Sequence, residues 1–158
     1  MTKNLLDFPA ETFARRRARI RKSMDGGVLV LPAAPVVRKS RDTVYRYRPD
    51  SDLFYLTGCV DPNVVAVIRD SGGEDDDFVL FVPPQDEKTE IWTGARPGPE
   101  ELKEILGASQ AFSLEELEEE LPKILRSGRR LFFRLGTYPN LDALVVKSLN
   151  WARAKGSR

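Results

Sequence analysis

Tyrosine and arginine side chains alternate at one point of this 158-residue chain. The string Tyr45-Arg46-Tyr47-Arg48 is closed by Pro49 and followed by a polar turn, Asp50-Ser51-Asp52. Tyrosine and arginine are the residue types that most often anchor contacts with other surfaces. This stretch is too polar for a core strand, and it predicts a recognition loop that is held on a rigid sheet.

A second candidate for ligand contact is Trp92, which precedes a turn rich in glycine and proline. An indole ring in such a place is either part of the core or a flat platform for a ligand. The residues around Trp92 favour the core position when they are considered alone, and they leave the platform open.

The chain contains no histidine and one cysteine, Cys59. The absence of histidine excludes Ser-His-Asp and Cys-His catalytic arrangements and any metal site built on imidazole. A single cysteine excludes an internal disulfide and suits a reducing compartment. We therefore interpret Cys59 as a small packing residue just after the end of an element.

Charge and hydropathy bound the partners and the location. The net charge is only +1, so the whole-chain balance predicts neither nucleic acid nor an anionic membrane as a partner. The N-terminal segment lacks the apolar core of a signal peptide, and no apolar run approaches a membrane span. The sequence accordingly predicts a cytoplasmic protein.

An arginine-rich helix is expected over residues 9–24, with Phe13, Ile20 and Met24 near one face and Gly26-Gly27 ending it. Its other faces carry Arg15, Arg16, Arg17, Arg19, Arg21 and Lys22. Such a cluster either binds phosphate groups or forms a solvated face that pairs with acidic residues elsewhere. The sequence favours the solvated face.

The remaining patterns predict one α/β domain with a mixed sheet. The apolar runs at 28–31 and 131–135 indicate strands, and the runs at 64–68 and 78–82 indicate an antiparallel hairpin. Residues 53–57 indicate a further strand, which ends at Gly58. Helices are expected over 99–106, from a capping box at Ser113 and Glu116, and from Asn140 onward. Pro122 either kinks the second of these helices or starts a new segment.

The motif around the recognition loop resembles that of the N-terminal domain of the Xaa-Pro aminopeptidases (aminopeptidase P), within the creatinase and prolidase family. The matching residues are Asp42, Tyr45, Tyr47, Arg48, Asp50, Ser51, Asp52, Tyr55, Leu56, Thr57 and Gly58. The string Glu90-Ile91-Trp92-Thr93-Gly94-Ala95-Arg96-Pro97-Gly98 looks like a second motif of the same domain. The likeness covers nearly the whole chain.

The resemblance implies a ribonuclease H-like α/β fold and a division of labour. In the family, hydrolysis belongs to a separate C-terminal pita-bread domain, which holds two metal ions, usually manganese in bacterial members. The resemblance also implies that Asp42 and Trp92, with Arg96 nearby, lie where the domain overhangs a catalytic cleft or contacts a neighbouring subunit. We assign the other motif residues mainly to structure: Tyr45, Tyr47, Arg48, Ser51, Asp52, Tyr55 and Gly58.

These expectations place the domain at residues 1–151 and the start of a linker to a catalytic domain at 152–158. The predicted function is the non-catalytic N-terminal part of a Xaa-Pro aminopeptidase, which shapes access to the cleft and supports a homo-oligomer; this chain alone is not catalytic. The peptide substrate would carry proline in second position, and two manganese ions would sit in the catalytic domain. One alternative is a stand-alone protein-binding module. The other, suggested by the fold type alone, is a metal-dependent nuclease; such an enzyme needs several carboxylates that converge on strands, whereas the acidic residues of this sequence lie in predicted loops and on helix faces.

Overall fold

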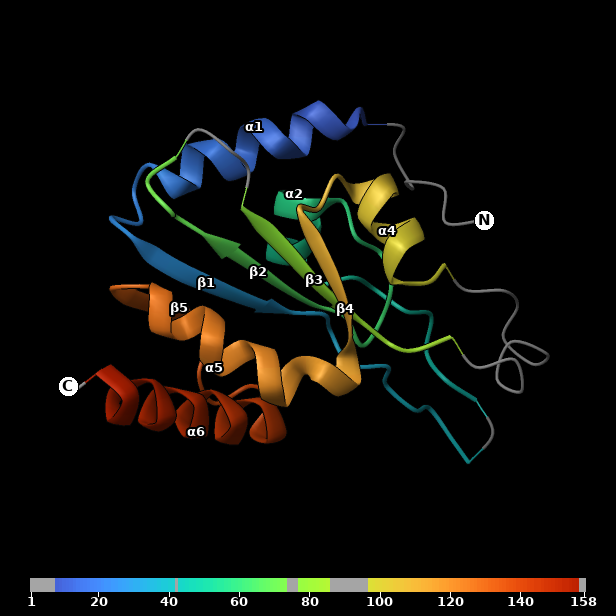
Figure 1. Cartoon of the computed structure of the whole chain (residues 1–158). Helices are drawn as coiled ribbons and strands as arrows, with labels where there is room; N and C mark the ends of the chain where they lie inside the picture. The colour runs from blue at the N-terminus through green and yellow to red at the C-terminus, as the bar shows by residue number, and fades with distance from the viewer. Residues whose placement is uncertain (1–7, 42, 74–76, 86–96, 157–158) are drawn as a thin grey trace.

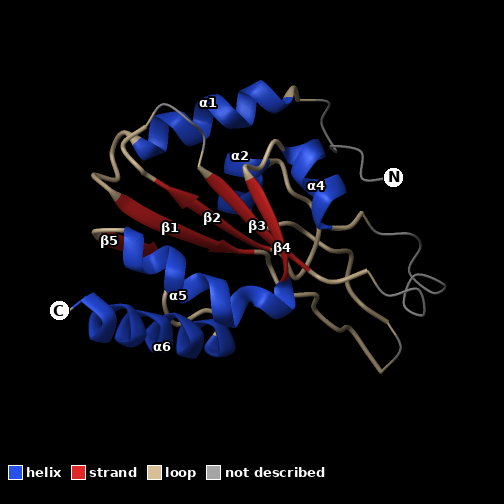
Figure 2. Ribbon diagram, viewed as in Figure 1, coloured by secondary structure: helices blue, strands red, loops and turns tan. Residues whose placement is uncertain are grey.

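The computed structural model describes residues 8–41, 43–73, 77–85 and 97–156. In chain order its elements are α1 Ala10–Arg21, β1 Gly27–Pro32, α2 Ser51–Thr57, β2 Val65–Arg69, β3 Phe78–Val82, α4 Pro99–Leu106, β4 Gln110–Ser113, the 3₁₀ turn η1 Leu114–Glu116, α5 Leu117–Ser127, β5 Arg130–Phe133 and α6 Pro139–Gly156. Within the described residues these elements form one three-layer α/β/α domain (Figures 1 and 2).

The central layer is a mixed sheet, whose described strands lie in the order β4-β3-β2-β1-β5. β1 pairs antiparallel with β2 and parallel with β5, so it lies inside the sheet, as its continuous apolar sequence predicts. β2 and β3 form the expected antiparallel hairpin, and β3 pairs parallel with β4. The mixed sheet and the single-domain α/β class are therefore confirmed.

Each sheet face is buried against its own set of helices, because alternate residues of a strand point to opposite faces. In β3, Phe78, Leu80 and Val82 belong to the core cluster that also contains α2 and α4 residues. Val79 and Phe81 belong to the cluster that contains α5 and α6 residues. In Figure 1, α1, α2 and α4 accordingly lie on one side of the sheet, and α5 with α6 on the other.

Helix α1 differs from the expected solvated face. Arg17 is only 1% exposed, and Arg21 is also buried, whereas Arg15 and Arg19 are exposed. The guanidinium of Arg17 donates to the backbone oxygen of Leu56 (3.0 Å) and lies 4.3 Å from the centre of the Phe78 ring. The prediction that the arginines form a solvated face is therefore wrong for Arg17, because its head group is satisfied inside the fold.

The strand predicted over residues 53–57 is also wrong, because this segment is helix α2. Leu53, Leu56 and Thr57 are buried, a spacing of three and four residues, while Tyr55 between them is 52% exposed. A strand would have placed residues 53, 55 and 57 on one face. The aromatic and apolar composition therefore misled the prediction, since packing overrides strand propensity.

Other boundaries follow the sequence closely. Ser113 and Glu116 form the capping box, and α5 then runs through Pro122 without a break between segments. The final helix starts at Pro139 and continues to Gly156, into the tail that the sequence predicts as the start of a linker. The short edge strand β4 was not predicted, since Gln-Ala-Phe-Ser carries little apolar signal.

Candidate functional site: an exposed arm on a clamped helix

The Tyr-Arg stretch lies in an arm, which we define as residues 36–41 and 43–48. Arg38 and Val44 form an isolated antiparallel bridge, and the backbone N–H of Tyr45 donates to the oxygen of Val37 (2.9 Å). Figure 1 shows this segment extending away from the sheet and its helices. Backbone pairing thus gives the arm a hairpin shape of its own, without cover from the core.

Apolar and aromatic side chains on this arm face solvent. Val37 is 56% exposed and Tyr45 is 55% exposed; Val36 and Val44 are exposed as well. Lys39 lies with its ammonium group 5.9 Å from the centre of the Tyr45 ring. Amphipathic aromatic side chains held on exposed backbone are suited to contact with a second surface.

The root of the arm is fixed by Tyr47. Its hydroxyl donates to the backbone oxygen of Asp61 at 3.4 Å. Burial is the main reason that the pKa of Tyr47 rises from 10.0 to about 12, so the phenol stays protonated and remains a donor at neutral pH. Tyr47 therefore anchors the base of the arm, whereas the side chain of Tyr45 is exposed.

Helix α2 follows the arm directly and is held at its N-terminal end by carboxylates. Oδ1 of Asp50 accepts from the backbone N–H groups of Asp52 and Leu53, both at 3.0 Å, which is an N-cap. Oδ2 of Asp50 lies 3.4 Å from Nη1 of Arg134, and the other guanidinium nitrogen binds Asp52. A loop residue that follows β5 thus ties the start of α2 to the sheet.

The C-terminal end of α2 is held by two neighbouring arginines of α1. Arg16 donates to the backbone oxygen of Tyr55 and Arg17 to that of Leu56, both at 3.0 Å. The Arg16 guanidinium also lies 4.3 Å from the centre of the Tyr55 ring. Carbonyl groups at a helix C-terminus lack intrahelical donors, so these bonds satisfy them and lock α1 to α2.

Gly58 ends α2 in the left-handed conformation, with φ of 73°. A Cβ atom at this position would lie 2.7 Å from a carbon of the Phe13 ring. Both the backbone conformation and the close approach of α1 therefore require glycine.

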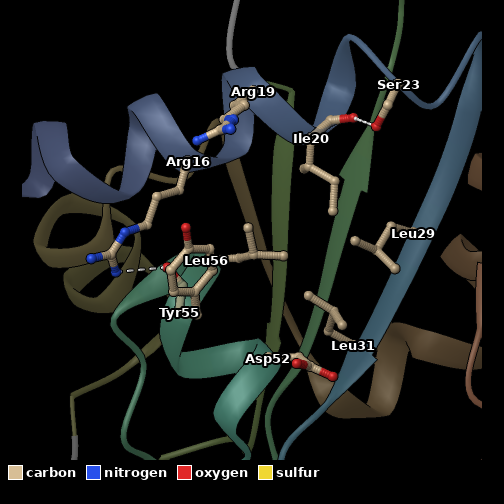
Figure 3. A pocket seen from close by; sticks show the side chains of 9 residues that line it. All are labelled: Arg16, Arg19, Ile20, Ser23, Leu29, Leu31, Asp52, Tyr55 and Leu56. Atoms are coloured by element: carbon tan, nitrogen blue, oxygen red, sulfur yellow. Dashed lines mark hydrogen bonds between the residues drawn. The ribbon is translucent and has the colours of Figure 1, made fainter.

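A pocket of about 540 Å³ opens between α1, α2 and β1 (Figure 3). Ile20, Leu29, Leu31 and Leu56 form its apolar floor; Arg16, Arg19, Ser23, Asp52 and Tyr55 form its rim. Within the described residues, no histidine, cysteine or carboxylate cluster of the kind that holds a metal ion is found.

Cys59 is not part of any reactive arrangement. It is buried, and burial raises its thiol pKa from 9.0 to about 12. A thiol with so high a pKa supplies almost no thiolate at neutral pH, so the interpretation of Cys59 as a packing residue agrees with its surroundings.

The predicted contact residues Asp42, Trp92 and Arg96 lie outside the described residues, so their proposed place at a cleft stays a prediction. Of the motif residues, Ser51, Asp52, Tyr55 and Gly58 lie on or directly after α2, and Tyr45, Tyr47 and Arg48 lie on the arm. Arg16, Arg17 and Arg134 make contacts that the sequence did not predict. No local signal distinguishes Arg16 and Arg17 from their neighbours in the basic run, and Arg134 is 84 residues from Asp50.

The fold and the arm define the class of protein. The family described as "Aminopeptidase P, N-terminal domain" matches residues 13–132 of the sequence. Because this match covers most of the chain, the chain belongs to that family. The resemblance that the motif predicted is confirmed.

Individual relatives agree. The chain is 34% identical over 144 residues to the Xaa-Pro aminopeptidase of Escherichia coli, covering 91% of this chain and 32% of that protein. It is 29% identical over 136 residues to the mitochondrial intermediate cleaving peptidase 55 of Arabidopsis thaliana, covering 84% and 27%. The chain therefore spans about a third or less of these relatives.

A solved structure shows the same fold. Aminopeptidase P from E. coli, in its low pH form, superposes with a TM-score of 0.84 at 32% identity, covering 91% of this chain and 33% of that one. A further solved structure is described as the Zn-substituted E. coli enzyme in complex with product. The relatives are thus hydrolases, and their structures match this chain over one domain.

Proposed function

We propose that this chain is the N-terminal domain of a longer Xaa-Pro aminopeptidase and contributes no catalytic group itself. The observation that carries the proposal is the match to the Xaa-Pro aminopeptidase of E. coli, which extends over 91% of this chain but only 32% of the relative. The absence of histidine from the sequence supports it, since a metal site with a histidine ligand must then come from another part of the protein.

In this proposal the arm is the part of the domain that contacts a second surface. Tyr45 and Val37 present apolar surface away from the core, while Asp50 and Arg134 fix the helix at the base of the arm. Such an arm suits contact with a neighbouring subunit of a homo-oligomer, where it would narrow the approach to a cleft. Asp42, Trp92 and Arg96 are proposed to complete that contact.

The full-length enzyme would release the residue before proline from peptides with proline in second position. Two manganese ions in the catalytic domain would supply the activated water. The compartment is proposed to be the cytoplasm. None of the described helices is long and apolar enough to cross a membrane, and one relative is mitochondrial.

The test is to determine how far the reading frame extends beyond the codon for Arg158, and then to assay its whole product. The expected result is manganese-dependent cleavage of a peptide with proline in second position by the longer product, and no cleavage by the 158-residue chain. A peptide with alanine in place of proline is the matched control. Metal-dependent cleavage by the 158-residue chain itself would refute the proposal.

A second candidate is a stand-alone protein-binding module of the same fold. The exposed apolar side chains of the arm favour binding of some partner even without a catalytic domain. A reading frame that ends at Arg158 would decide for this candidate. Capture with the arm intact and with Tyr45→Ser would then be compared.

A further inference from the structure

Within the described residues, one part of the sheet is left uncovered on the side that carries α1, α2 and α4 (Figure 1). Leu131 and Phe133 of β5 pack against the opposite core cluster, so Phe132 points to this side, where its side chain is 38% exposed. Its register partner in β1 is Leu29, which is only partly buried. The apolar surface therefore continues from the pocket floor to the sheet edge.

We define the open β1 surface as the pocket between α1, α2 and β1 together with Phe132. Figure 3 shows Ile20, Leu29 and Leu31 lining the space between α1 and β1, with Arg16 and Arg19 on α1 at its rim. The surface thus combines an apolar floor with a rim that carries two arginines and Asp52, whose carboxylate pairs with Arg134. Its complement is a segment that offers an apolar side chain next to a carboxylate.

The position of this surface indicates which segment that is. The C-terminal end of α6 lies at the end of the sheet where β1 and β5 begin (Figure 1). The matched relatives extend well past the region shared with this chain, which is only 32% of the E. coli protein. Polypeptide that continues from α6 would start at this end of the sheet, on the face opposite the open β1 surface, and would reach that surface by passing β5, the last described strand (Figure 1).

We propose that the open β1 surface is the contact between this domain and the polypeptide that follows it in a longer chain. An apolar side chain of that polypeptide fills the space over Leu29 and Ile20, and a carboxylate pairs with Arg19 and Arg16. The inference rests on the proposed function, because it requires a chain that continues. Contacts between domains of one chain are more polar than permanent interfaces, which agrees with this mixed lining.

The test compares how accessible the open β1 surface is to a thiol reagent in the 158-residue chain and in the longer product of the reading frame. Ser23 is exposed at the rim, in the turn after α1, and its hydroxyl donates to the Ile20 oxygen of α1, so Ser23→Cys is a small change. Cys59 does not compete for a thiol reagent, since it is buried with its pKa raised to about 12. The rate at which Ser23→Cys is alkylated at about pH 7.5, well below that pKa, is followed by mass spectrometry of the peptide that contains it.

We expect alkylation at this position to be at least about tenfold slower in the longer chain than in the 158-residue chain, as for a site exposed only by domain opening. The matched control is Ile105→Cys on α4, whose side chain is 39% exposed and lies outside the open β1 surface. Its rate should differ by less than about twofold between the two chains. Equal rates for Ser23→Cys in both chains would overturn the proposal, and so would equal slowing at both positions.

A charge reversal tests the second half of the inference. Adding Arg19→Glu to Ser23→Cys in the longer chain should restore fast alkylation by placing two carboxylates together, while Arg15→Glu, also exposed on α1, should not. If Arg19→Glu has no effect, the carboxylate contact is refuted. An active longer enzyme with an accessible Ser23→Cys refutes only this inference, whereas a frame that ends at Arg158 refutes the proposed function as well.

Discussion

The arm and helix α2, which together span the segment 36–58, are neighbours in the sequence but differ in how the structure holds them. In the second half, α2 has Leu53 fully buried and each end bound by arginines from elsewhere in the fold. In the first half, the arm exposes Val37 and Tyr45 and is held mainly by its own backbone bonds. The residues of one family motif therefore serve two purposes: those of α2 fix the segment to the fold, and those of the arm expose side chains to a second surface.

The difference shows how a surface arm can be placed accurately without being packed. Asp50 caps α2 and also binds Arg134, while Tyr47 ties the arm to Asp61, so the junction is fixed on both sides. Everything beyond that junction is available for another surface. Substitutions in the clamped half should therefore change stability, and substitutions in the arm should change association.

The largest effect is expected for Arg17→Met. The substitution keeps apolar volume but removes the buried bond to the Leu56 oxygen and the contact with the Phe78 ring. Leaving that carbonyl without its donor should lower the free energy of unfolding by about 2–4 kcal/mol, measured by urea denaturation. Arg15→Met, on the exposed side of the same helix, should change it by less than about 0.5 kcal/mol. Equal losses would show that α1 contributes only its helical propensity.

Gly58→Ala should come next, at about 2–3 kcal/mol, because it combines a left-handed backbone with overpacking against Phe13. Gly107→Ala is the matched control. Gly107 has φ of 67°, and nothing lies within 4 Å of its would-be Cβ, so only the backbone cost of about 1 kcal/mol remains. If both variants lose the same stability in thermal or urea unfolding, the close packing of α1 on α2 is not what fixes this end of the helix.

Asp50→Ala is expected to cost about 1–2 kcal/mol, the usual range for loss of an N-cap. Asp50→Asn should recover most of this loss, since its amide oxygen still accepts from the backbone of Asp52 and Leu53. Asp52→Ala removes only an exposed ion pair with Arg134 and should cost less than about 1 kcal/mol. A loss for Asp50→Asn as large as for Asp50→Ala would assign the effect to the charge pair instead of the cap.

The sequence predicts the sheet well, but it does not predict the side-chain bonds that hold the two ends of α2, and both outcomes have physical reasons. The runs at 64–68 and 78–82 are short, rich in valine and phenylalanine and bounded by turn residues, which favours a strand covered on both faces, so the sequence predicts them correctly. The segment 53–57 is too short for its period to separate helix from strand, and an aspartate that caps a helix has the same composition signal as one in a turn. Long-range partners leave no local pattern, so the bonds of Arg17 and Arg134 appear only in three dimensions.

The candidate site divides in the same way. Resemblance to the family identifies the arm and the residues at its base from the sequence alone, because the motif residues match one by one. The roles of Asp42, Trp92 and Arg96 depend on a second surface, and no property of one chain specifies where that surface lies. These three residues therefore stay predictions, to be tested on the whole enzyme.

The smallest effect on stability should come from Tyr45→Ser on the arm. Tyr45 is 55% exposed, and its backbone N–H bond to the Val37 oxygen does not depend on the side chain. We expect the free energy of unfolding to change by less than about 0.5 kcal/mol. The same substitution should weaken self-association of the longer enzyme by about tenfold, since a tyrosine at the centre of an interface is a common anchor, and sedimentation of a dilution series would measure it.

Val146→Ser is the control for this variant, because Val146 is 48% exposed on α6, away from the arm. It removes a similarly exposed apolar side chain and should leave association unchanged. Loss of stability in Tyr45→Ser with unchanged association would reverse the assignment and make the arm part of the anchor. Unchanged stability with weaker association would establish that α2 fixes the segment to the fold while the arm makes the contact between subunits.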